Sequence, residues 1–157
     1  MAASVRLQGI HHVTLITRDM EAMTHFLTEV VGIHLVKTTV NFDSSEQKHF
    51  YFGDEKGQPG TVITYFEIPD LPENRLGAGG MHHLAFCVED ESDLSAQMER
   101  LEGMGIAHSG VLDRTYFKSL YFKGPDGLTV EFATAGPGFQ ADGDQIEGKI
   151  VHGRPGR

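Results

Sequence analysis

Apolar and polar positions alternate along several short segments of this chain, and two longer segments repeat apolar positions at helical spacing. Residues 10–17 alternate around β-branched side chains, which predicts a strand. From Asp19, a predicted N-cap, apolar residues recur at i, i+3, i+4 and i+7, which predicts a helix that Gly32 ends. The apolar face of this helix consists of Met23, Phe26, Leu27 and Val30. Three extended segments follow, separated by turn-forming residues, at 34–41, 48–52 and 61–68.

The same order of elements returns in the second half of the chain. A predicted strand at 82–88 precedes a helix from about Asp90 to Glu102. The apolar positions of this helix, at i, i+4 and i+7, are Leu94, Met98 and Leu101. Extended segments follow at 108–112, 118–123 and 128–134, with the turn Gly124-Pro-Asp-Gly127 before the last one. Each half therefore predicts the order βαβββ, and the fold class is α+β.

Each half also opens with a pair of histidines, in Gly9-Ile-His-His-Val and in Gly80-Met-His-His-Leu. His12 precedes Gly32 by twenty residues and His83 precedes Gly105 by twenty-two, and an isoleucine follows each glycine. The sequence therefore predicts two copies of one structural module. The predicted division is a lead-in at 1–8, a first module at 9–70, a linker at 71–80, a second module at 81–135 and a C-terminal tail at 136–157.

Composition narrows the classes of function. With 157 residues, of which 39% are hydrophobic, the chain can form one compact domain or two small modules that share a core. The net charge of -9 and the scattered Lys and Arg residues argue against nucleic-acid binding. No apolar stretch approaches the roughly 20 residues that cross a bilayer, so no membrane partner is expected. Cys87 is the only cysteine and no secretory leader is visible, which predicts a cytoplasmic protein.

A carboxylate in the last predicted strand is the strongest single candidate for chemistry. Alternation places Glu131 on the face opposite Val130 and between small residues, as in a lined cavity. The alternative interpretation is that Glu131 faces solvent. For each histidine of the two pairs, the alternative is a hydrogen-bonded residue at the end of a strand. Because the His pair recurs at one module position, we interpret His12, His83 and Glu131 as a metal-binding triad of two histidines and one carboxylate.

The remaining metal-capable residues show no comparable arrangement. Ordinary surface or structural roles are expected for His25, His34, His49, His108 and His152. Cys87 lies in phase with His83 along the predicted strand and could line the same cavity. A buried, inert thiol is the expectation for it.

The motifs together resemble the vicinal oxygen chelate superfamily, which includes glyoxalase I, bleomycin-resistance proteins and extradiol dioxygenases. The resemblance rests on the His-His-Val-Thr-Leu and His-His-Leu-Ala-Phe starts and on the ending Gly-Pro-Asp-Gly-Leu-Thr-Val-Glu, and it spans about residues 9–139. It implies paired βαβββ modules whose curved, mixed sheets enclose a metal-centred cavity. Longer segments are similar to the ring-cleaving hydroquinone dioxygenases: residues 35–43, 51–55, 59–66 and 113–122.

This resemblance implies roles for named residues. It makes His12, His83 and Glu131 the ligands of Fe(II), with Mn, Ni or Zn as alternative metals. In glyoxalase I a fourth ligand, a Glu, comes from the strand that here contains Thr64, and Glu67 should face the other side of that strand. The residues implied to support the metal or touch the substrate are His11, Thr14, His82, Arg114 and Tyr121.

Two of these supporting residues have an unsettled direction. Strict alternation sends His11 and His82 away from the faces that bear His12 and His83, whereas the resemblance keeps them near the site.

Arg114 would stabilise a substrate phenolate. Tyr121 and one of the two supporting histidines would exchange protons during ring opening.

The resulting hypothesis is an Fe(II)-dependent, extradiol-type ring-cleaving dioxygenase that acts on a hydroquinone-type aromatic diol with O₂. The alternatives are a glyoxalase-like metal-dependent lyase or isomerase, against which Thr64 counts, and a non-enzymatic, ligand-sequestering resistance protein. A homodimer is expected because symmetric dimers are the commonest oligomers. The cavity could form within one chain or across such a dimer.

Overall fold

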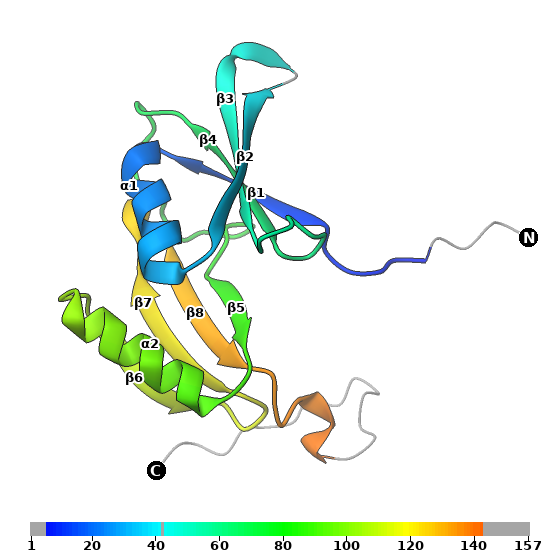
Figure 1. Cartoon of the computed structure of the whole chain (residues 1–157), viewed down its shortest axis with the longest axis vertical. Helices are drawn as coiled ribbons and strands as arrows, with labels where there is room; N and C mark the ends of the chain where they lie inside the picture. Colours follow the sequence, from blue (N-terminus) through cyan, green and yellow to red (C-terminus); the bar gives the residue numbers. More distant parts are fainter. Residues whose placement is uncertain (1–5, 42, 143–157) are drawn as a thin grey trace, which may run out of the picture. The chain divides into compact units, whose positions relative to one another are not determined.

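The structure is a computed structural model that describes residues 6–41 and 43–142. It divides into two compact units, the first up to Glu73 and the second from Asn74 onward. Part of the predicted lead-in and the tail beyond residue 142, including His152, lie outside the described residues. Each unit contains a four-stranded sheet with its own helix (Figure 1).

The first unit has the predicted order βαβββ. Its elements are β1 (His12–Thr17), α1 (Met20–His25), η1 (Phe26–Val31), β2 (His34–Asn41), β3 (Ser44–Gly53) and β4 (Val62–Glu67). The strands lie in the order β1-β4-β3-β2. The β1–β4 pair is parallel and the other two pairs are antiparallel, so the sheet is mixed.

The second unit repeats this plan. Its elements are β5 (Leu84–Val88), α2 (Glu91–Gly103), β6 (His108–Asp113), β7 (Lys118–Lys123), η2 (Pro125–Gly127), β8 (Thr129–Thr134) and η3 (Phe139–Asp142). The strand order is β5-β8-β7-β6, again with one parallel pair, β5–β8, and two antiparallel pairs. The predicted α+β fold with two βαβββ modules is therefore confirmed.

The first helix begins as predicted and then changes its pitch. The Asp19 carboxylate accepts a hydrogen bond of 3.0 Å from the amide of Ala22, which caps α1. From Phe26 the chain widens into a π-helix, and it ends at Gly32 with a positive φ of 91°. A continuous α-helix was expected here. The wider turn brings both Val30 and Val31 onto the buried side, where only Val30 was expected.

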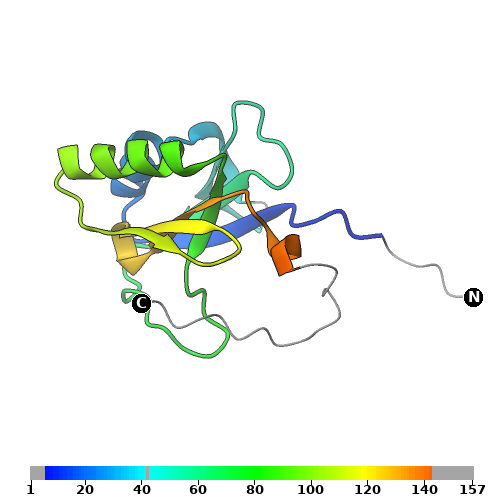
Figure 2. The same cartoon turned by 90° about the horizontal axis from the view of Figure 1, so that it is seen from below.

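The helix of the second unit covers one face of its sheet, and Figure 2 shows α2 on one side of the strands. Asp90 caps it by accepting a hydrogen bond of 2.7 Å from the amide of Ser92. Its buried side chains are Leu94, Gln97 and Leu101, so Gln97 takes the place expected for Met98. Within the described residues no helix is both long and apolar enough to cross a membrane.

Alternation along the strands then decides what the other face carries. The strand residues buried on the helix side of the second sheet are apolar except for Thr134 at the end of β8; the others are Leu120, Phe122, Val130 and Phe132. Because successive side chains point to opposite faces, Glu131 lies on the face that α2 does not cover. The face of this sheet that α2 does not cover is therefore the one that carries the candidate site residue Glu131.

Candidate metal centre

Strand register brings three predicted site residues onto that face of the second unit. Tyr121 of β7 pairs directly with Glu131 of β8, and Glu131 pairs with Ala85 of β5. His83 lies on the same side of the sheet, because its Nε2 is 2.8 Å from Oε2 of Glu131. The phase predicted for Glu131 and Tyr121 from alternation is therefore confirmed.

Glu131 is buried and fully engaged, with 2% of its surface exposed. Its Oε1 accepts hydrogen bonds from the hydroxyl of Ser119 at 2.5 Å and from that of Tyr121 at 2.8 Å. Its Oε2 lies 2.8 Å from Nε2 of His83. The solvent-facing interpretation of Glu131 is thus wrong. Two hydroxyl donors hold one carboxylate oxygen, and the other oxygen is presented to the imidazole.

The two histidines of each pair contact one another. Nδ1 of His82 lies 2.8 Å from Nδ1 of His83, and the same atoms of His11 and His12 lie 3.0 Å apart. In each contact one nitrogen donates and the other accepts, which occupies Nδ1 and leaves Nε2 for a further partner. Alternation did not apply to the supporting histidines, because β1 begins at His12 and β5 begins at Leu84.

A permanent positive charge lies beside this cluster. The Arg114 guanidinium carbon is 5.2 Å from the centre of the Tyr121 ring, within the range of a cation–π contact. The rings of Tyr121 and His83 are in turn nearly perpendicular, with centroids 5.8 Å apart. The second unit therefore gathers His82, His83, Arg114, Tyr121 and Glu131.

Ser119 belongs to the same cluster, and the sequence did not identify it as a site residue. Its side chain is completely buried and its hydroxyl donates to Glu131. The available signal was its phase, because Ser119 lies two positions before Tyr121 in the same strand. Alternation within β7 alone did not show that β7 pairs with β8, or that Ser119 lies close to Glu131.

In the first unit, Thr64 occupies the position that corresponds to Glu131. Thr14 pairs with Thr64 just as Ala85 pairs with Glu131, and Thr14 and Ala85 each lie two residues after the second histidine of a pair. The Thr64 hydroxyl donates to that of Thr14 at 2.9 Å. Glu67 accepts a hydrogen bond of 2.8 Å from the amide of Met20, so its carboxylate lies at the start of α1. This matches the prediction that Glu67 faces away from Thr64.

His49 of the first unit was expected to have an ordinary role. Its Nδ1 lies 2.9 Å from the hydroxyl of Tyr51, and its ring stacks at 4.1 Å on Phe66. Burial, and to a smaller extent the nearby His12, lower the pKa of His49 below its usual value, which favours the neutral ring. Its Nε2 is buried and has no hydrogen-bond partner among the described residues.

Cys87 and the other described histidines lie outside these clusters. Cys87 is exposed, so the expectation of a buried thiol is wrong. It lies on the sheet face that α2 leaves uncovered, in phase with His83. His108 has a structural role, because its Nδ1 accepts a hydrogen bond of 3.1 Å from the amide of Gly110.

The pair of His83 and Glu131 fits a divalent metal. Neither unit by itself, over its described residues, brings together three His, Cys, Asp or Glu side chains for an ion. Nε2 of His83 and Oε2 of Glu131 are 2.8 Å apart. Two neighbouring donor atoms that each lie about 2.1 Å from one ion are separated by about 3 Å, so the observed distance is close to that of a shared metal. Imidazole and carboxylate donors together suit Fe, Mn, Ni or Zn.

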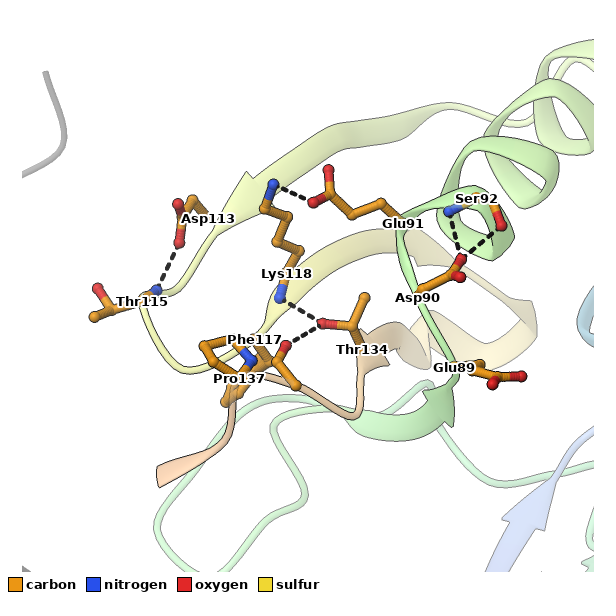
Figure 3. Close-up of a pocket in the computed structure, with 11 residues that line it drawn as sticks. Glu89, Asp90, Glu91, Ser92, Asp113, Thr115, Phe117, Lys118, Thr134 and Pro137 are labelled. Carbon is orange, nitrogen blue, oxygen red and sulfur yellow. Dashed lines mark hydrogen bonds and ion pairs between the residues drawn. The ribbon is translucent and has the colours of Figure 1, made fainter. Parts of the chain in front are cut away.

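A separate cavity of about 680 Å³ lies in the second unit, between the start of α2 and the ends of its strands (Figure 3). It is lined by Glu89, Asp90, Glu91, Ser92, Asp113, Thr115, Phe117, Lys118, Thr134, Gly136 and Pro137. None of the predicted site residues lines it. The Lys118 ammonium is paired with Glu91, and Asp113 accepts a hydrogen bond from the Thr115 amide. This cavity is therefore distinct from the candidate metal centre.

Comparison with known proteins identifies the family. The family model described as the Glyoxalase/Bleomycin resistance protein/Dioxygenase superfamily matches residues 9–132, a range that contains His12, His83 and Glu131. The chain belongs to this superfamily. The resemblance seen in the motifs is thus confirmed.

Several of the relatives to which this chain is similar are named as dioxygenases. MhqE of Bacillus subtilis (strain 168), named as a ring-cleaving dioxygenase, is 42% identical over 103 residues, which cover 66% of this chain and 34% of MhqE. The chlorohydroquinone/hydroquinone 1,2-dioxygenase of Sphingobium indicum is 32% identical over 123 residues, which cover 77% of this chain and 38% of that enzyme. The crystal structure of a protein named as a dioxygenase, from Bacillus subtilis subsp. subtilis str. 168, superimposes with a TM-score of 0.75 at 32% identity. It covers 83% of this chain and 42% of that one. The chain thus spans less than half the length of these relatives.

Proposed function

We propose that this protein is an Fe(II)-dependent ring-cleaving dioxygenase that acts on a hydroquinone-type aromatic diol, with Mn, Ni or Zn as alternative metals. The observation that carries the proposal is the buried Glu131, whose Oε2 is presented to His83 while two hydroxyls hold its Oε1. His12 is proposed as the third ligand. Bound to these three residues, the metal would supply open coordination positions for the diol and O₂ and a route for electrons between them.

The hydroxyl donors around Glu131 would keep that carboxylate in a fixed orientation. Ser119 and Tyr121 both donate to Oε1, and these two hydrogen bonds hold the carboxylate in one position. The carboxylate therefore does not have to reorganise when a cation binds. His82 and His11 would act in the same way on the imidazoles, because each contacts Nδ1 of its neighbour and leaves Nε2 available.

Arg114 and Tyr121 would act on the substrate. Arg114 is permanently cationic and lies over the Tyr121 ring, so it would favour the phenolate form of a diol bound nearby. The Tyr121 hydroxyl holds a proton at Oη, which it would exchange with the substrate during ring opening. Thr14 contributes a hydroxyl to the corresponding face of the first unit. Catalytic or positioning roles are thus proposed for all five supporting residues, which are His11, Thr14, His82, Arg114 and Tyr121.

Thr64 supports the dioxygenase over the glyoxalase-like alternative. Its register position corresponds to that of Glu131, but its side chain is a hydroxyl that is already bonded to Thr14. The first unit therefore offers no carboxylate at this position. A three-ligand centre leaves one more position for substrate than a four-ligand centre does. A homodimer and a cytoplasmic location remain predictions from the sequence.

The test begins with protein purified without oxygen. We expect stoichiometric iron, and oxygen uptake on addition of substituted hydroquinones. Glu131→Gln and His83→Ala should lose both the metal and the uptake, whereas His25→Gln, at an exposed position on α1, should keep both. Stoichiometric iron without uptake across the hydroquinones would exclude the activity. Unchanged metal content in both ligand variants would exclude the metal site.

A further inference from the structure

The first unit carries a counterpart of the metal half-site in which the chemistry of each position has changed. Tyr51 pairs with Thr64 as Tyr121 pairs with Glu131. Two positions earlier on the same strands, His49 pairs with Phe66 as Ser119 pairs with Ala133. Register therefore matches Tyr51 with Tyr121, Thr64 with Glu131, and His49 with Ser119.

These replacements remove the metal-binding group and leave a hydrogen-bonding pair. In the second unit, Ser119 and Tyr121 both donate to the Glu131 carboxylate. In the first unit Thr64 offers no carboxylate, and the Tyr51 hydroxyl lies 2.9 Å from Nδ1 of His49 instead. The face that corresponds to a metal half-site thus presents a tyrosine–histidine pair.

The environment of His49 fixes its ring and leaves one nitrogen without a partner. The ring contacts two aromatic neighbours, with centroids 4.3 Å from Tyr51 and 4.1 Å from Phe66. Its Nε2 is buried and forms no hydrogen bond with any described residue. Buried polar atoms are rarely left unpaired in native proteins, because the lost hydrogen bonds to water are not replaced. The orphaned Nε2 therefore points to a hydrogen-bonding group from outside the chain.

A hydroxyl suits this position better than a group that can only donate or only accept. If Tyr51 donates to Nδ1, then Nε2 carries the proton and donates; if Nδ1 donates to Tyr51, then Nε2 accepts. A hydroxyl can complete either arrangement. The rings of Tyr51 and Phe66 beside His49 add aromatic surface against which another ring can pack.

We propose that His49, held by Tyr51, is a substrate-binding residue that forms a hydrogen bond through Nε2 with a phenolic hydroxyl of the aromatic diol. The identity of the ligand as a diol rests on the proposed function. The two units then have divided roles, since the second holds the metal carboxylate and the first recognises an organic hydroxyl. His49 is in this way a specificity-determining residue.

The experiment compares hydroquinone with phenol, which lacks the second hydroxyl. Both are titrated by calorimetry, without oxygen, into the full chain, and the ratio of their Kd values measures the preference for the second hydroxyl. We expect His49→Phe to reduce this preference about three- to tenfold, the size of one lost neutral hydrogen bond. His49→Gln, which keeps a hydrogen-bonding group, should retain part of the preference. His25→Phe is the matched control and should behave as the unmodified protein.

Two further readouts separate this inference from the proposed function. Metal content and Tm are measured on the same samples. A reduced preference in His49→Phe, with metal content and Tm at the values of the unmodified protein or higher, supports the inference. It does so even if no oxygen uptake is found, in which case only the proposed reaction fails. An unchanged preference in His49→Phe overturns the inference while leaving the metal and the reaction intact. If His49→Phe does not fold, the same comparison is made with His49→Leu, which also lacks a hydrogen-bonding side chain.

Discussion

Replacing Ser119 with Ala tests whether the buried hydroxyls prepare Glu131 for a metal. The Ser119 side chain has no exposed surface, and its hydroxyl donates to Oε1 of Glu131 at 2.5 Å. Hydrogen bonds to a charged group contribute about 1.5–3 kcal/mol. In Ser119→Ala the Tyr121 hydroxyl still donates to the same oxygen, so the loss should lie near the lower end of this range.

A loss of about 1.5 kcal/mol corresponds to a rise of roughly tenfold in the metal Kd, within the about 10- to 100-fold range found when groups that orient metal ligands are removed. The assay is anaerobic competition for Fe(II) with a chromophoric chelator. Metal-dependent stabilisation in thermal unfolding provides an independent measure of Kd. Ser95→Ala is the matched control, because this exposed serine on α2 bonds only to a backbone carbonyl of its own helix.

The double variant Ser119→Ala/Tyr121→Phe completes the test. Both hydroxyls share one carboxylate oxygen, so the effects of the two changes on the metal Kd should not be additive. A metal Kd in Ser119→Ala that equals that of the Ser95→Ala control would refute the role of the hydroxyls. Additive effects in the double variant would show that the two donors act independently of their common acceptor.

Other changes probe the first unit, the core and a helix cap. Thr64→Glu places a carboxylate at the position that matches Glu131, so it should lower the metal Kd and reduce oxygen uptake. A metal Kd and an oxygen uptake that both equal those of the unmodified protein would contradict the register argument. Leu101→Ala removes a fully buried side chain of α2 and should lower the free energy of unfolding by about 2–5 kcal/mol in urea titrations. The hydrogen bonds from Ser92 lower the pKa of Asp90, so its contribution to stability is present above its unfolded pKa of about 4 and is lost as the pH falls through the folded value. Asp90→Asn should therefore weaken the dependence of Tm on pH in this acidic range, and an unchanged slope would exclude the cap as its cause.

Local patterns in the sequence predicted most of the fold. The predicted strands at 34–41 and 118–123 have the bounds of β2 and β7. The first helix begins after its predicted cap, Asp19, and the second begins one residue after its predicted start at about Asp90. Alternation, capping and glycine at a positive φ act between residues that are close in sequence, so they can be read without the fold. The π-helix of η1 had no such signal, although its wider turn accompanies the burial of both Val30 and Val31. The greater length of β3 likewise follows from its pairing with β2.

The sequence by itself determined the faces of the candidate site, and the tertiary structure decided its connections. The repeat identified His12 and His83, and alternation placed Glu131 and Tyr121 opposite the apolar face. Only strand pairing showed that Ser119 reaches Glu131. Hydrogen bonds across a sheet join residues whose separation in sequence depends on loop lengths and register, which alternation within one strand does not encode. For the same reason His49 was assigned an ordinary role until pairing matched it with Ser119.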